Sequence, residues 1–128
     1  MSHSKDSQTL EFEEARGDAA RKFQFQYGRS IRISRVDYKI VPCETIHLNG
    51  QECLGVCDPE IGTLYVNIKV GSPAETLLHE IVHGELSECG IKQHPKWCTE
   101  LEEIVAEVLS KAIASQFKLK KIGLRAGR

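Results

Sequence analysis

The chain has 128 residues, of which 41% are hydrophobic and 27% are charged, a composition typical of one small globular domain. Seventeen basic and 18 acidic residues give a formal net charge of -1, so no overall positive field indicates a nucleic-acid or membrane partner. The apolar runs are short and the first residues are polar, which predicts neither a membrane span nor a secretion signal. We therefore expect a cytoplasmic protein.

The charge pattern and the cysteines suggest how a single domain over residues 1–128 is organised. We expect a helical extension over residues 1–28, a core over residues 29–117 and a basic, flexible tail over residues 118–128. The five cysteines are an odd number, which favours free thiols in a protein without an export signal. Cys53 and Cys57 are spaced more widely than the pairs of zinc ribbons, so we interpret them as packed side chains.

The first 42 residues predict one helix and one strand. The stretch from Thr9 to Tyr27 is rich in Glu, Ala, Arg, Lys and Gln, with apolar residues at roughly helical spacing, although Gly17 weakens the pattern. From Ser30 to Ile40 apolar and polar residues alternate, and Pro42 closes the segment. Alternation of this kind predicts a strand.

The middle of the chain predicts a β-hairpin. Residues Ile46 to Leu48 are expected to form a short strand or a loop. Leu54 to Cys57 and Thr63 to Val70 are strand candidates, and the residues between them form a turn that Asp58-Pro59 opens and in which Gly62 can adopt a positive φ. We therefore predict strand, turn and strand.

Two helices are predicted after this hairpin. Ser72 is a helix N-cap, and Glu75 stands where a capping box requires an acid. Apolar residues at helical spacing extend this helix from Pro73 to about Glu88, and Gly90 stops it. A second helix is predicted from about Trp97 to Phe117.

The first of these two helices contains the motif His79-Glu80-Ile-Val-His83. Residues four apart share one face of a helix, so the two imidazoles can bind one metal ion. Glu80 can then act as the general base that takes a proton from a zinc-bound water as the water attacks a carbonyl. The sequence therefore predicts one zinc ion per chain and a hydrolytic site.

A catalytic zinc ion requires a third protein ligand, for which the sequence offers several candidates. Leu86 and Cys89 occupy the positions at which the extended metzincin motif has Gly and His, which disfavours that class. Cys89 as a thiolate and His94 from the following loop are alternatives. We favour Glu102, because it lies beside the apolar stripe of the next helix, and keep Glu103, nearer the polar side, as the alternative.

Four segments together resemble the small ImmA/IrrE-type zinc metallopeptidases, many of which are encoded by phages and integrative elements. The segments are the motif helix Glu75 to His83, the turn entry Gly55 to Asp58, the alternating strand Leu64 to Ile68 and the segment Glu102 to Val105. The resemblance covers about residues 36 to 114.

The resemblance implies an α+β, minimal zincin-like fold. In it a small, mostly antiparallel twisted sheet packs on the active-site helix, and a glutamate from the following helix completes a His, His, Glu site. It also implies proteolysis of a protein partner, which in characterised members is a transcriptional repressor.

In such a fold an edge strand before the active-site helix can pair with an extended substrate through backbone hydrogen bonds. We expect Thr63 to Val70 to be that strand. Tyr65, His47 and His94 are then candidates to contact the substrate or to stabilise an oxyanion.

The leading hypothesis is a zinc-dependent endopeptidase that cleaves a specific protein, with His79, His83 and Glu102 as ligands and Glu80 as base. The alternative is a metal-stabilised binding module that docks on a host or phage protein without cleaving it. A third hypothesis is nucleic-acid binding through the basic stretches Arg16 to Lys39 and Lys118 to Arg128. No helix-turn-helix or zinc-finger spacing supports it.

Overall fold

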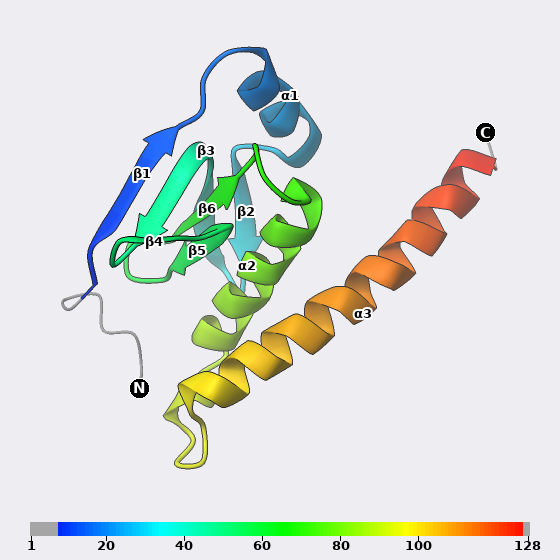
Figure 1. Ribbon diagram of the computed structural model, residues 1–128. Helices are drawn as coiled ribbons and strands as arrows, with labels where there is room; N and C mark the ends of the chain where they lie inside the picture. Colours follow the sequence, from blue (N-terminus) through cyan, green and yellow to red (C-terminus); the bar gives the residue numbers. More distant parts are fainter. Residues whose placement is uncertain (1–7, 127–128) are drawn as a thin grey trace.

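The structure, a computed structural model, describes the backbone of residues 8–126 and the side chains of residues 8–116. It confirms an α+β chain with a six-stranded mixed sheet and three α-helices (Figure 1). In chain order the elements are β1 (Leu10–Glu14), α1 (Asp18–Tyr27), β2 (Ser30–Ile33), β3 (Val36–Leu48), β4 (Gln51–Glu52), β5 (Gly55–Asp58), β6 (Thr63–Asn67), α2 (Pro73–Glu88), a 3-10 turn η2 (Ile91–Gln93) and α3 (Thr99–Ala126).

The long strand β3 organises the sheet. The order of the main strands is β1-β3-β6-β5, and β2 and β4 also pair with β3. Every pairing is antiparallel except that of β3 with β6, in which Ile40 lies opposite Leu64. As a result β6 is an interior strand and β5 forms an edge.

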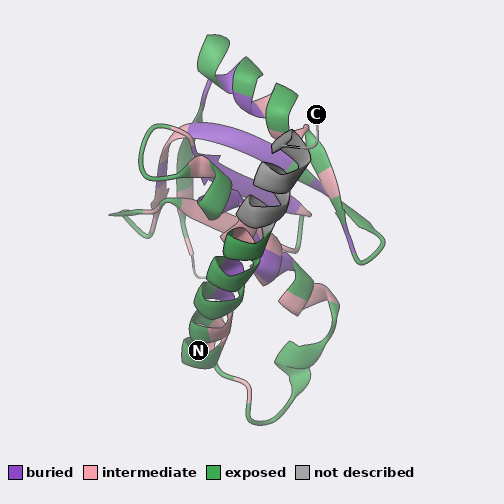
Figure 2. Ribbon diagram, turned by 90° about the vertical axis from the view of Figure 1, so that its right-hand side faces the viewer, coloured by how far each residue is buried: buried purple, intermediate pink, exposed green. Residues whose placement is uncertain are grey.

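Each face of the sheet carries its own apolar cluster, and the strands of the sheet hold many of the buried residues (Figure 2). Leu64 and Val66 lie on the face that α2 covers, where Leu77 of α2 packs against them. Because side chains alternate along a strand, Tyr65 lies on the opposite face. There its ring packs against Phe12 of β1, with the ring centroids 4.7 Å apart.

The predicted helix from Thr9 to Tyr27 is wrong in its first half. Residues Leu10–Glu14 form β1, which pairs with the second half of β3, and α1 begins only at Asp18, after Gly17 with φ 87°. The helix-forming composition of this stretch is overridden by backbone pairing with β3, which local propensity does not detect.

The predicted single strand from Ser30 to Ile40 is instead a hairpin. Ser34 and Arg35 have positive φ values of 48° and 77°, the conformation of a two-residue turn between antiparallel strands. Such turns usually contain Asn or Gly, so Ser-Arg gave no turn signal. The strand does not end at Pro42, since β3 continues to Leu48. Just after Pro42 the pairing of β3 with β1 is irregular, and a proline is tolerated in a strand beside such an irregularity.

The hairpin of β5 and β6 and the helix α2 are confirmed. β6 ends at Asn67, whose Oδ1 accepts hydrogen bonds from the backbone of Lys69 and Val70 at 2.8 and 3.2 Å. These bonds turn the chain toward α2, whose first turn is capped by the Ser72 hydroxyl.

Helix α3 is longer than predicted, because its backbone continues through most of the expected basic tail to Ala126. Residues 127 and 128 lie outside the described part of the chain. Among the residues that the structure describes, none of the helices is both long enough and apolar enough to cross a membrane.

Candidate metal centre

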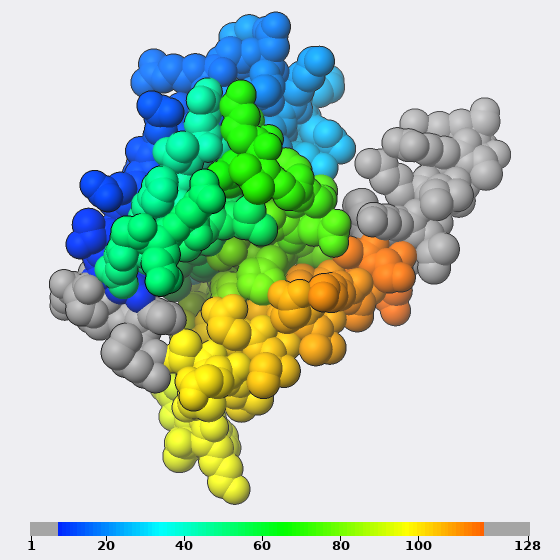
Figure 3. Space-filling model, in the orientation of Figure 1, coloured from blue at the N-terminus to red at the C-terminus, as the bar shows by residue number. Residues whose placement is uncertain are grey.

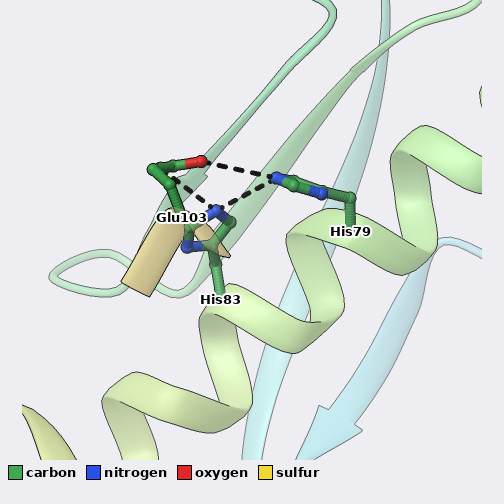
Figure 4. A group of neighbouring side chains, drawn as sticks. All are labelled: His79, His83 and Glu103. Atoms are coloured by element: carbon green, nitrogen blue, oxygen red, sulfur yellow. Dashed lines mark hydrogen bonds and ion pairs between the residues drawn. The ribbon is translucent and has the colours of Figure 1, made fainter. Parts of the chain in front are cut away.

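Helix α2 carries the two histidines on the side that faces α3. Leu77 and Val82 of the same helix are buried, and this fixes the direction in which the two imidazoles project. His79 and His83 lie one turn apart, with their Nε2 atoms 3.2 Å apart (Figure 4). Two imidazoles held this close can share one ion.

Glu103 of α3 is the acidic residue that joins the histidines. One of its carboxylate oxygens lies 3.8 Å from Nε2 of His79, and the other lies 3.4 Å from Nε2 of His83. Ligand atoms of the three residues all lie within 4.8 Å of one another, so the group could hold a metal ion. The alternative named from the sequence, Glu103, is thus the residue that the structure brings to this position.

The preference for Glu102 as the third ligand is not supported by the geometry. Its Oε2 lies 2.7 Å from Nδ1 of His83, on the side of the ring away from His79. Its Oε1 accepts a hydrogen bond from Nε1 of Trp97 at 3.3 Å and lies 3.4 Å from Nζ of Lys92. Although burial opposes it, the hydrogen bond with His83 and the charge of Lys92 hold the pKa of Glu102 below its usual range.

The contact with Glu102 has a consequence for metal binding. If Nδ1 of His83 donates its proton to this carboxylate, Nε2 carries no proton and its lone pair is free for a metal ion. In that state Glu102 orients the ring of His83 and leaves its Nε2 available to a metal ion. This contact is not predictable from the sequence, because it depends on how α3 is rotated against α2.

Glu107 makes a longer contact of the same kind with His79. Its carboxylate lies 3.7 Å from Nδ1 of His79 and pairs with Nζ of Lys111 at 2.9 Å. Burial, together with the neighbouring His83, lowers the pKa of His79, which favours the neutral imidazole that a metal ion requires. Glu107 stands one helical turn after Glu103, and the sequence does not predict its contact with His79.

Glu80 lies beneath the β5 strand. Only 6% of its surface is exposed, and burial, reinforced by the charges of Glu103 and Glu102, raises its pKa to about 8. A Cβ atom on Gly55 of β5 would lie 2.9 Å from Cγ and from Oε2 of Glu80. The backbone of β5 thus approaches this carboxyl so closely that only glycine fits at position 55 without a shift.

The candidate metal centre opens into a cavity of about 750 Å³ between the β5 side of the sheet and α3 (Figure 3). His79, Glu80, His83 and Glu103 all line it. A second hollow, of about 400 Å³, is lined in part by Gly55, His79 and Glu80 as well. Both hollows therefore border the candidate metal centre at Gly55, His79 and Glu80.

The structure does not bring the other predicted contacts to this centre. Tyr65 lies on the opposite face of the sheet, against Phe12. His94 is exposed, and its Nδ1 accepts a hydrogen bond from the backbone of Lys96. His47 lies in β3 opposite Glu52. The exposed thiol of Cys89 donates a hydrogen bond to the carbonyl of Leu86.

The expectation that Thr63 to Val70 is an edge strand is wrong, because β6 lies between β3 and β5.

All five cysteines are free thiols, as predicted. Cys53 and Cys57 line the larger cavity without belonging to the candidate metal group. Burial raises the pKa of both thiols. Both sulfurs are therefore protonated at neutral pH when no metal ion is bound.

No protein family, curated protein or solved structure matches the chain. The interpretation of the site therefore depends on its own geometry.

We expect exchange of Glu103 and of Glu102 to have different effects on metal binding. Glu103→Gln removes a ligand and should abolish the tetrahedral absorption spectrum that Co²⁺ gives with the parent protein. Glu102→Gln removes only the partner of His83 and should weaken Co²⁺ binding by about 10- to 100-fold. Titration with Co²⁺, followed by visible absorption, measures both.

The matched control is Glu100→Gln, which makes the same change one turn earlier on α3 at an exposed residue. The reverse order, with loss of binding in Glu102→Gln and near-parental affinity in Glu103→Gln, would contradict the assignment.

The close approach of β5 to Glu80 gives a second prediction. Gly55→Ala inserts a methyl group against Glu80 and Thr76 and should lower the free energy of unfolding by about 1–3 kcal/mol, as overpacking does. Urea unfolding followed by circular dichroism measures this loss. In a double-mutant cycle with Glu80→Ala the loss should shrink; an unchanged loss would show that the added methyl group does not meet Glu80.

Proposed function

We propose that the chain is a zinc-dependent endopeptidase that hydrolyses a peptide bond in a protein partner. The observation that carries the proposal is the juxtaposition of two imidazoles and a carboxylate with Glu80, a buried carboxyl that lines the same cavity. A site that only stabilises the fold needs no further acid between its two histidines, whereas a hydrolytic site needs a base there.

The donor atoms fit zinc. Two nitrogen donors and one oxygen donor, with one position left open, are typical of catalytic zinc sites. Ligand atoms about 2.0–2.1 Å from a tetrahedral zinc ion lie about 3.3 Å from one another. Nε2 of His79 and Nε2 of His83 lie 3.2 Å apart, and Nε2 of His83 lies 3.4 Å from the Glu103 oxygen.

Zinc, when bound, polarises the substrate carbonyl and lowers the pKa of water to about 7. Glu80 then takes a proton from the attacking water and returns it to the leaving amine. The raised pKa of Glu80 favours this exchange, since a base works best when its pKa lies near the working pH. The positive charge of a bound metal ion opposes that rise, because it favours the carboxylate.

The edge strand β5 is the substrate platform in this proposal. It borders the cavity at Gly55, Val56 and Cys57, and its free edge offers backbone N–H and C=O groups to an extended peptide. An edge strand beside the candidate metal centre suits an extended, unfolded segment better than a compact small molecule. A regulatory protein such as a transcriptional repressor, the substrate class that the sequence resemblance implies, can supply such a segment in an exposed linker.

Glu80→Gln should separate catalysis from metal binding. The exchange keeps the shape of the side chain and all three metal ligands, so the fold and the zinc content should remain parental. Peptide cleavage should fall by at least about 100- to 10,000-fold, the contribution of a general base. A proteome-derived peptide library incubated with the zinc-loaded protein, with new N-termini identified by mass spectrometry, provides the measurement.

The proposal requires cleavage by the zinc-loaded parent that disappears in Glu80→Gln and on removal of zinc by a chelator. Equal cleavage by parent and variant would show that Glu80 is not the base. A parent that binds zinc but cuts nothing in the library or in co-encoded regulators would favour the metal-stabilised binding module instead.

A further inference from the structure

Helix α3 carries apolar side chains on the face turned away from α2. Ala106 and Ser110 are buried on the inner face. On the outer face Leu101, Ile104 and Val108 are exposed, with Ile104 and Val108 at 61% and 60% of their full surface. Together with the exposed Ala112, these residues follow one another at spacings of three and four, and we call this set the outer stripe.

The outer stripe is uncovered in the described part of the chain. α2 is the element of that part against which α3 packs substantially, and Figure 1 shows α3 crossing α2 and extending beyond the body of the domain. The helix has 28 residues, a length of about 42 Å at 1.5 Å per residue. A long helix with an apolar face in water is marginal unless another surface covers that face.

The charges of α3 are segregated along its length. From Thr99 to Ser110 the helix has four glutamates and no basic residue, whereas from Lys111 to Ala126 the sequence has five basic residues and no acidic one. This order also suits the helix dipole. In a pair of such helices, a parallel arrangement places like charges together and an antiparallel arrangement places the acidic half of each helix along the basic half of the other.

The middle of the helix suits a twofold axis. The midpoint of Thr99–Ala126 falls beside Ala112, where the outer stripe has a small side chain, and Ser115 follows one turn later. Small residues at the crossing point allow two helices to approach closely. In a twofold dimer both subunits contribute the same surface patch to the interface. The outer stripe alone can therefore form both sides of such an interface.

We propose that the outer stripe of α3 binds a second copy of this chain, with the two α3 helices antiparallel. The active-site cavity is lined from the other side of α3, by Glu102 and Glu103, so the dimer leaves the metal centre open. The proposal is independent of the proposed peptidase function, because it rests on the outer face of the helix alone.

The test is the molar mass of the full chain in solution over a range of concentrations, by light scattering and sedimentation equilibrium. We expect a dimer whose dissociation constant rises by about 100-fold or more in Ile104→Lys/Val108→Lys, since the change removes apolar contacts and places lysines along the basic half of the partner helix. Both positions are exposed in the single chain, so circular dichroism and metal content should stay parental. Phe25→Lys, which makes a similar change at a residue 89% exposed on α1, should leave the dimer intact.

A monomeric parent at the highest soluble concentration would overturn the proposal and leave the stripe to a different protein. A dimer that tolerates the double substitution, or one that Phe25→Lys also dissociates, would overturn it as well.

Orientation is tested by cross-linking with a short bismaleimide after Cys89→Ser and Cys98→Ser have removed the exposed thiols. Ala112→Cys, near the axis, should cross-link, and Leu101→Cys, at one end, should not. Efficient cross-linking at both positions would indicate parallel helices and would contradict the antiparallel arrangement; the parent lacking both exposed thiols is the blank.

Discussion

The candidate site depends above all on how α3 lies against α2. Among the described side chains of α3, Ala106 and Ser110 are the buried ones, and because they are small the two helix backbones can approach closely. At this separation the neighbouring acids Glu102 and Glu103 lie on either side of His83, one against each ring nitrogen. Successive residues are about 100° apart around a helix, so the rotation of α3 that these two small residues set determines which acid lies near both histidines and which lies behind His83.

The sheet supplies the second constraint, which acts on Glu80. Pairing of β6 between β3 and β5 places Gly55 at the point where the edge strand covers the carboxyl of Glu80. Burial there raises the pKa of this group, and the absence of a side chain on Gly55 leaves room for it. The buried carboxyl of Glu80 and the edge strand beside it thus come from the contact between α2 and β5, while the candidate metal group comes from α2 and α3. The two contacts meet only in the cavity.

The sequence predicts those parts of this arrangement that depend on local spacing. The bounds of α2, its cap at Ser72 and the hairpin before it follow from turn residues and helical periodicity, and the position of the two histidines follows from the motif itself. It does not predict β1, because the pairing of Leu10–Glu14 with β3 is a long-range contact that opposes the local composition. For the same reason the sequence does not show that β5 rather than β6 is the edge strand, or that Glu103 rather than Glu102 lies near both histidines. Strand order and helix rotation are set by packing between distant segments.

We propose that His79, His83 and Glu103 together hold one zinc ion and that Glu102 lies behind His83. A crystal structure of the zinc-loaded protein, with anomalous diffraction data collected on both sides of the zinc absorption edge, tests this arrangement. We expect one anomalous peak per chain, within coordination distance of Nε2 of both histidines and of a Glu103 oxygen, with Glu102 still hydrogen-bonded to Nδ1 of His83. A peak coordinated by Glu102 or by a cysteine, or the absence of a peak at the histidines, would contradict it.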